Sequence, residues 1–66
     1  MRTIEFCYMD VLNTRKITSW KSEENGVGYH IDDKNRTLRV WQKDSNLNQT
    51  LVMSMYRVEY VKMLER

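Results

Sequence analysis

The fold class of this chain is decided by the stretch VGYHIDDKNRTLRVW, residues 27–41. Val27, Tyr29 and Ile31 occupy alternate positions, so one face of a strand over these residues would be apolar. After the polar cluster DDKN, Leu38 and Val40 alternate in the same way with polar or aromatic neighbours. Two alternating runs joined by a loop rich in aspartate and asparagine predict a β-hairpin.

Two further runs of strand length precede this hairpin. Residues 4–12, IEFCYMDVL, are apolar on both faces, which is typical of a central strand covered on both sides. Residues 16–22 offer only Ile17 and Trp20 as large apolar side chains. We therefore expect this second run to be an edge strand.

The C-terminal stretch, residues 50–65, fits two interpretations. As a helix it would carry one apolar stripe, made of Met53, Tyr56, Tyr60 and Leu64. As two strands it would turn near Tyr56-Arg57. The two-strand interpretation is favoured, because Val58 and Val61 fall outside the helical stripe and valine prefers strands.

These runs predict a single mostly β domain over residues 1–66. A chain of this length buries roughly 60% of its unfolded surface, and seven aromatic residues argue against disorder. We expect a small antiparallel β-meander of five or six strands, curled into a partly open barrel. The alternative is a β-meander with a C-terminal α-helix.

Several classes of protein are disfavoured by composition. No apolar run approaches the roughly 20 residues of a membrane span, and the first residues carry charges within their apolar stretch, unlike a secretory signal. The single cysteine, Cys7, excludes an internal disulfide and favours a reducing compartment. We therefore expect a cytoplasmic protein without a membrane partner. The net charge of +2 is too small to identify a polyanionic partner by itself.

The sequence offers little for catalysis or metal binding. Cys7 and His30 are the only soft ligands and the only candidate dyad, with Asp32 as a group that could orient the ring. The cluster at 32–35 lacks the ligand spacing of a calcium loop, and Gly26-Val27-Gly28 lacks the lysine of a phosphate-binding loop. We predict no catalytic residue, no metal site, no cofactor and no enzymatic activity.

Aromatic side chains beside cations are the strongest functional signal. Arg39 and Trp41 fall on the polar face of their strand, with Arg36 and Lys43 near its ends. Trp20 is likewise flanked by basic residues. Such groups can anchor a protein interface, or they can stack bases while the cations contact phosphates.

Three segments of the chain resemble the cold-shock domain. They are Trp20 with Gly26-Val27-Gly28-Tyr29, then residues 38–41, then residues 57–61. In that family a tryptophan and two aromatic strands build a face for single-stranded nucleic acid on an oligonucleotide-binding barrel. This chain departs from the family at Asn25, where the family has lysine, and at Val27, where it has phenylalanine.

The first functional hypothesis is a protein partner. Tryptophan, tyrosine, arginine and methionine, which are enriched at interface hot spots, occur two, four, six and five times. We expect a small non-catalytic module that modulates or inhibits a partner protein, of the kind encoded by phages or other mobile elements. Its contact residues would be Trp20, Tyr29, Arg39 and Trp41.

The alternative hypothesis is a single-stranded nucleic-acid-binding domain with an aromatic and basic face of the cold-shock type. Its contact residues would be Arg36, Arg39, Trp41 and Lys43. A homodimer, which would cover an exposed strand edge, is compatible with either hypothesis.

Overall fold

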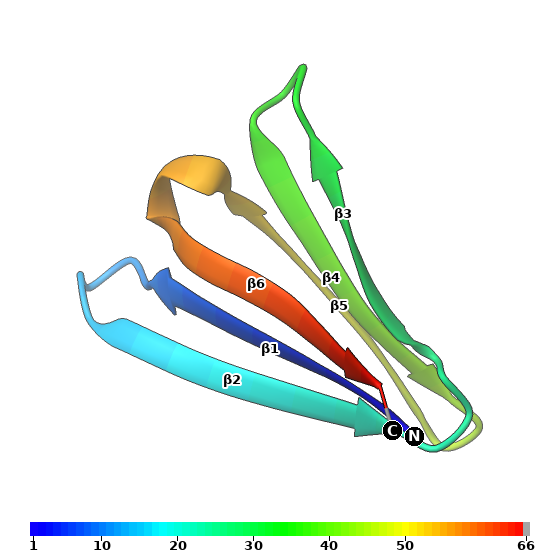
Figure 1. Cartoon of the computed structure of the whole chain (residues 1–66). Coiled ribbons are helices and arrows are strands. Elements are labelled where there is room, and N and C mark those ends of the chain that lie inside the picture. Colours follow the sequence, from blue (N-terminus) through cyan, green and yellow to red (C-terminus); the bar gives the residue numbers. More distant parts are fainter. Residues whose placement is uncertain (66) are drawn as a thin grey trace.

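The computed structural model describes residues 1–65, which form two three-stranded antiparallel sheets (Figure 1). The strands are β1 (Arg2–Met9), β2 (Arg15–Ser22), β3 (Val27–Asp32), β4 (Thr37–Asp44), β5 (Leu47–Ser54) and β6 (Val58–Glu65). A short 3-10 turn, η1 (Met55–Arg57), joins β5 to β6. One sheet has the order β2-β1-β6 and the other the order β3-β4-β5.

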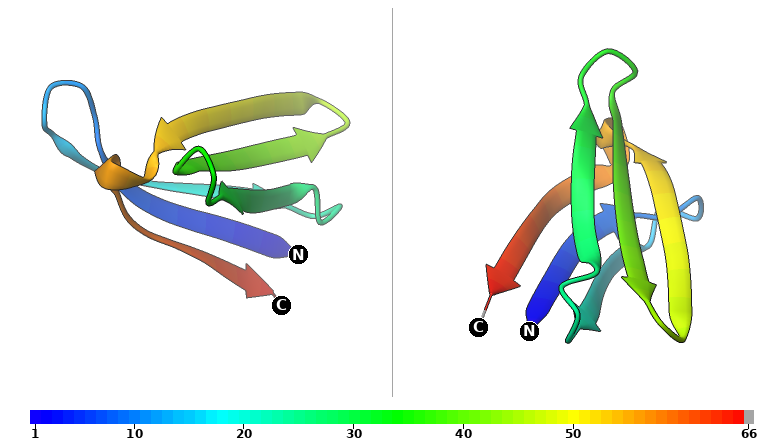
Figure 2. Two further views of the ribbon diagram at one scale, coloured as in Figure 1. Left: turned by 90° about the horizontal axis from the view of Figure 1, so that it is seen from above. Right: turned by 90° about the vertical axis from the view of Figure 1, so that its right-hand side faces the viewer.

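The two sheets face each other and do not close into a complete barrel (Figure 2). The hairpin β1–β2 and the meander β3–β4–β5 each form locally, whereas β6 returns to pair with β1. The prediction of a small, mostly β fold is confirmed, and its arrangement is that of a partly open barrel. The alternative C-terminal helix is wrong. No helix within residues 1–65 has the length and apolar character needed to span a membrane.

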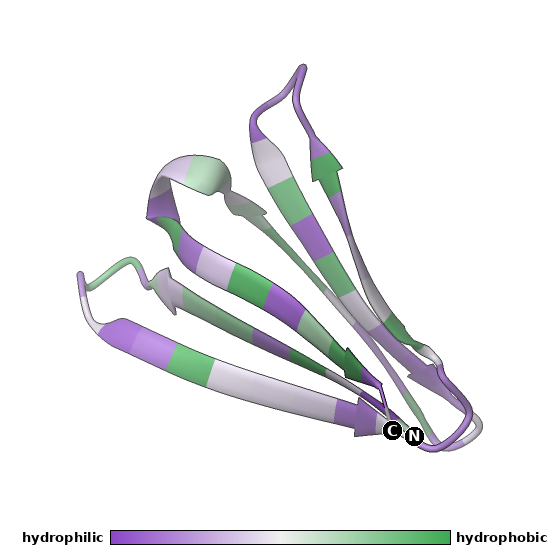
Figure 3. Ribbon diagram, viewed as in Figure 1, coloured by the Kyte–Doolittle hydropathy of each residue, from purple (hydrophilic) through white to green (hydrophobic). Residues whose placement is uncertain are grey.

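The hydrophobic core between the sheets is small. Its fully buried members are Ile4, Phe6, Val27, Leu38 and Val40. The alternation in sequence accounts for this, because residues two apart on a strand share a face. Figure 3 shows the same alternation of hydrophobic and hydrophilic residues along β4 and β6. Burial of these few side chains must supply most of the stability of the domain.

The N-terminal runs take the predicted places in the sheet, but the first strand is shorter at its end than predicted. β1 lies between β2 and β6, and β2 is an edge strand. The predicted run extended to residue 12, whereas β1 ends at Met9, and Val11 and Leu12 lie exposed in the turn that follows. The indole of Trp20 packs edge-on against the ring of Phe6, with 5.0 Å between their centroids. Ile17 points to the opposite face and is 54% exposed. Only one of the two apolar side chains of β2 therefore contributes to the core.

The C-terminal stretch forms two strands, β5 and β6, and a bulge in the pairing of β6 with β1 puts more of its apolar residues on the core side. Tyr60 pairs with Cys7, but Val58 pairs with Tyr8, so the register shifts by one residue between them. As a result Val58 and Val61, three residues apart, both pack against the core. The predicted turn at Tyr56-Arg57 is confirmed as part of η1.

The connection between β4 and β5 is a tight turn. Only Ser45 and Asn46 form it, and β5 begins at Leu47. The tight connection lets Lys43 pair with Asn48 and Asp44 with Leu47. Asn46 therefore lies in the turn, whereas Asn48 belongs to the strand.

Candidate functional site

The tryptophan of β4 lies on the outer surface of its sheet, away from the core. In the sheet register Trp41 is opposite Gly28 of β3 and Thr50 of β5. We call this outer surface the Trp41 face; the register places on it Gly28, His30, Arg39, Trp41, Lys43, Asn48, Thr50 and Val52. It is a three-stranded surface with one large aromatic side chain.

The indole of Trp41 lies directly over the backbone of Gly28. A Cβ atom added at Gly28 would come within 2.6 Å of Cζ2 of the indole. Only glycine therefore permits this close approach of the ring to β3. The indole is half-buried on this side, and its position is set by the cross-strand pair.

A shallow hollow of about 220 Å³ surrounds this tryptophan. It is lined by Arg39, Trp41, Lys43 and Thr50. The guanidinium carbon of Arg39 is 5.6 Å from the indole centroid, within the range of a cation–π contact. The hollow thus combines an aromatic ring with two cations and can hold a flat, anionic group.

The charges of the two sheets are arranged differently. Within residues 1–65 the four ion pairs all lie in the β2-β1-β6 sheet or between this sheet and the β1–β2 loop. They are Arg2–Glu65, Arg15–Glu59, Lys16–Asp10 and Lys62–Glu5. In the same part of the chain, Arg39 and Lys43 form no ion pair. Both are exposed, so their charges are directed at solvent or at a ligand.

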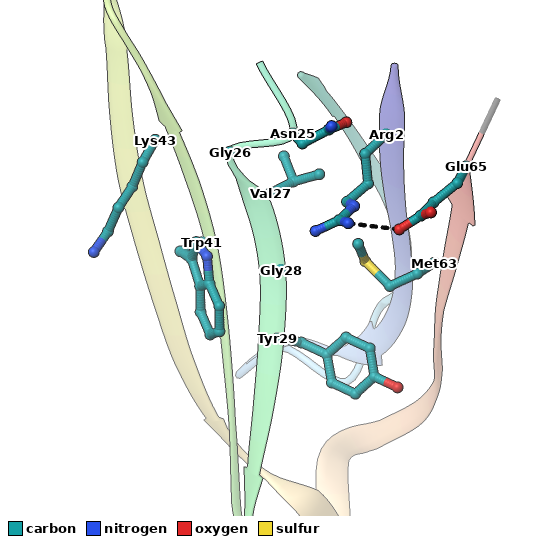
Figure 4. A pocket seen from close by; sticks show the side chains of 10 residues that line it. All are labelled: Arg2, Asn25, Gly26, Val27, Gly28, Tyr29, Trp41, Lys43, Met63 and Glu65. Atoms are coloured by element: carbon teal, nitrogen blue, oxygen red, sulfur yellow. Dashed lines mark ion pairs between the residues drawn. The ribbon is translucent and has the colours of Figure 1, made fainter. Parts of the chain in front are cut away.

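The residues predicted for a protein interface do not form one surface. Trp20 packs against the core, and Tyr29 lies on the inner side of β3, where it pairs with the buried Val40. Figure 4 shows Tyr29 and Trp41 on opposite sides of β3. Of this predicted set, only Arg39 and Trp41 are neighbours.

Three of the four residues predicted to contact nucleic acid do lie together: Arg39, Trp41 and Lys43. Arg36 is the exception. It lies in the β3–β4 loop with a left-handed backbone (φ 56°), its carbonyl accepts a hydrogen bond from the Met55 amide at 2.9 Å, and its guanidinium contacts the ring of Tyr56. These contacts connect the loop to η1.

Gly28, which contacts the Trp41 indole, and Thr50, which lines the hollow, were not among the predicted contact residues. The position of Gly28 beside Trp41 could have been predicted from the register of the hairpin. Counting outward from the hairpin loop, with Asp32 opposite Thr37, places Gly28 opposite Trp41. No comparable signal identifies Thr50, because its register depends on the length of the turn before β5.

The candidate dyad is not assembled. Cys7 follows the buried Phe6 and lies on the outer face of its sheet, where it pairs with Ile17 and Tyr60. His30 lies on the outer face of the other sheet, opposite Arg39. Since the sheets pack through their inner faces, the thiol and the imidazole point in different directions.

The thiol of Cys7 belongs to a polar cluster on β1, β2 and β6. Its Sγ atom donates to Oε2 of Glu59 at 3.2 Å, and the same oxygen accepts from Nε of Arg15 at 2.7 Å. Burial, followed by the hydrogen bond to Glu59, raises the pKa of Cys7. The hydrogen bond from Arg15, followed by that from the thiol, lowers the pKa of Glu59. The thiol is thus held protonated, the opposite of what a nucleophilic cysteine needs.

A second polar group lies beside the first on the same face. The Tyr60 hydroxyl donates to Oε2 of Glu5 at 2.7 Å, and the Lys62 ammonium is 3.4 Å from that oxygen. The hydrogen bond from Tyr60 lowers the pKa of Glu5 and raises that of Tyr60. Residues 1–65 contain no group of three or more histidine, cysteine, aspartate or glutamate side chains that could hold a metal ion.

We expect the thiol of Cys7 to react slowly in the folded protein. It has no exposed surface and is kept protonated, whereas disulfide exchange requires an accessible thiolate. Reaction with a chromogenic aromatic disulfide at pH 8 should be at least tenfold slower than in denaturant, where the thiol has the ordinary pKa of about 8.5. Equal rates in the two conditions would contradict the burial of this side chain.

No known protein family matches this chain, and neither a curated protein nor a solved structure matches it. The resemblance to the cold-shock domain is therefore not supported by a family match. Its function has to be inferred from the geometry and charge of the Trp41 face.

Proposed function

We propose that this chain is a non-catalytic module that binds single-stranded nucleic acid on the Trp41 face. The observation that carries the proposal is the hollow in which the Trp41 indole lies between two cations that have no ion-pair partner in residues 1–65, Arg39 and Lys43. Aromatic rings in basic grooves bind single strands because every base has a flat π face and every linkage a phosphate.

In this mode a base stacks on the Trp41 indole. Arg39 and Lys43 are four residues apart on β4, which separates their Cα atoms by about 13 Å along the strand. Their side chains contact phosphates on either side of that base. Thr50 borders the hollow, and its hydroxyl can donate or accept a hydrogen bond. An unstacked strand is required, because bases within a duplex do not expose their faces.

The charge of this face favours nucleic acid over a protein ligand at the same place. The two cations can be matched by phosphates at regular intervals, and the only carboxylate that the register places at this face is Asp32, at its end. Asp32 is occupied by the loop, where it accepts hydrogen bonds from Asn35 and Lys34 that lower its pKa. The first hypothesis from sequence was a protein partner. Binding of an acidic protein to this face is the alternative that the experiment below would detect.

Removing one phosphate contact should change the salt dependence of binding. Two contacts to a single strand predict a slope of log K against log salt of about −1.4, and Lys43→Ala should reduce it to about −0.7, because each phosphate releases about 0.7 counterion. The measurement is fluorescence anisotropy of a labelled oligodeoxythymidine of about ten nucleotides, within the usual site size, titrated at several salt concentrations.

A matched control is available in the hairpin loop. Arg36→Asn removes a cation outside the hollow and keeps a residue type that tolerates the left-handed backbone; it should leave the slope unchanged. Equal effects of the two variants, or binding without salt dependence, would contradict the proposal. Equally tight binding of polyglutamate would also contradict it, since that result would indicate an acidic protein surface as the ligand.

A further inference from the structure

A groove runs between the free edges of the two sheets. Trp41 borders it, but Arg2, Tyr29 and Met63 line it on the opposite side of β3 from the indole (Figure 4). We call it the β3–β6 groove; its volume is about 480 Å³, and its lining includes Arg2, Val27, Tyr29, Met63 and Glu65. This volume is within the range of ligand sites. Val27 and Tyr29 are two residues apart on one wall, and Met63 and Glu65 are two apart on the other.

The wall formed by β3 has free backbone groups. Within residues 1–65, β3 pairs only with β4 and β6 pairs only with β1. The amide of Lys43 donates to the carbonyl of Gly26 at 2.8 Å. Because bonded and non-bonded pairs alternate in an antiparallel ladder, the backbone N–H and C=O groups of Val27, Tyr29 and Ile31 point away from β4, toward the edge.

The same alternate residues provide apolar side chains at this edge. Tyr29 and Ile31 lie on the core side of β3 but are each 38% exposed, whereas Val27 is 1% exposed. An apolar surface with free backbone donors and acceptors beside it is the arrangement used in β-strand addition. A strand paired here would cover both.

An arginine lies at the end of the groove near Val27. Arg2 pairs with Glu65 through Nη2 at 2.6 Å, but its Nε atom is buried and has no hydrogen-bond partner in the described chain. Lys43 also borders the groove, but its side chain lies on the side of β3 that Trp41 occupies (Figure 4). The unsatisfied Nε of Arg2 therefore favours an occupant with a carboxylate at this end.

We propose that the β3–β6 groove binds an extended segment of a partner protein by strand addition to β3. The segment has an apolar side chain that contacts Tyr29 and Met63, and an aspartate or glutamate two residues along that contacts Arg2. The spacing of two follows because alternate side chains of a strand share a face. Trp41 and Lys43 border both this groove and the hollow. The proposed contacts to Tyr29, Met63 and Arg2 lie on the other side of β3 from the indole (Figure 4), so this proposal does not rest on nucleic-acid binding.

The test uses a blocked peptide of about eight residues, the length of an ordinary strand, that alternates threonine with valine and has one glutamate two residues after a central valine. Binding is followed by the backbone amide signals of isotope-labelled protein. The amides of Val27, Tyr29 and Ile31 should shift and become protected from hydrogen exchange. Arg2→Gln should weaken binding about tenfold or more, because a hydrogen bond to a charged group is lost, and Lys62→Gln should not.

Two control peptides separate pairing from simple apolar contact. N-methylation at alternate residues, which removes the backbone donors that would face β3, should abolish binding. Glutamine in place of glutamate should weaken binding as much as Arg2→Gln does. Shifts confined to β2 or β5, or full binding of the N-methylated peptide, would overturn the proposal. Protection of β3 that rises with protein concentration without peptide would overturn it too, in favour of a second copy of the chain.

Discussion

Replacing Trp41 with alanine is expected to weaken binding of single-stranded DNA by about 5- to 150-fold, because stacking on an aromatic side chain contributes roughly 1–3 kcal/mol per base. The loss should be nearly independent of salt, since the substitution removes no charge. Anisotropy titrations of the labelled oligodeoxythymidine at two salt concentrations measure both quantities. An unchanged affinity would show that the indole is not a stacking surface.

Gly28→Ala provides an independent test of the same surface. The added Cβ would lie 2.6 Å from the Trp41 ring and would displace it, although no ligand-contacting group is removed. Affinity should fall in the same direction as in Trp41→Ala. Circular dichroism of both variants establishes that the sheet is retained, so that a loss of binding can be assigned to the position of the ring.

Replacing Phe6 with alanine is expected to remove a large share of the free energy of unfolding of the domain. Phe6 has no exposed surface and contacts the rings of Tyr8 and Trp20, and truncation of a buried phenylalanine costs about 3–5 kcal/mol. A domain of this size has a total free energy of unfolding of roughly 3–10 kcal/mol. Denaturant unfolding followed by tryptophan fluorescence measures the change.

Phe6→Leu is the matched control for this core position. It keeps an apolar side chain between the sheets and should cost markedly less than the alanine substitution. A loss of less than about 1 kcal/mol for Phe6→Ala would contradict the account of the core, because so small an effect is typical of exposed positions.

Local patterns predicted the hairpin and its outward-facing residues. The alternation of Leu38 and Val40 with Arg39 and Trp41 was sufficient to place the arginine and the tryptophan on the outer face, because side-chain direction in a strand depends only on parity. The same reasoning identified β1 as a central strand. Predicting these features requires no knowledge of contacts between residues that are far apart in the sequence.

Features that depend on distant pairing could not be predicted in the same way. Trp20 and Trp41 both have basic neighbours in sequence, yet only Trp20 contacts the core, because β2 pairs with β1 and places this residue opposite Ile4. The bulge beside Glu59 and the bond between Arg36 and Met55 also arise from contacts across the sheets. A weakly alternating strand does not reveal which face is buried.

The central claim is most directly tested by the indole signals of the two tryptophans during a titration with the single-stranded oligonucleotide. Their N–H groups give two separate signals in a nitrogen–proton correlation spectrum. The account predicts that the Trp41 indole and the amides of Arg39 and Lys43 shift progressively, while the Trp20 indole, which packs on Phe6, stays in place. Shifts that leave Trp41 unaffected, or that are equal for the two indoles, would contradict binding on the Trp41 face.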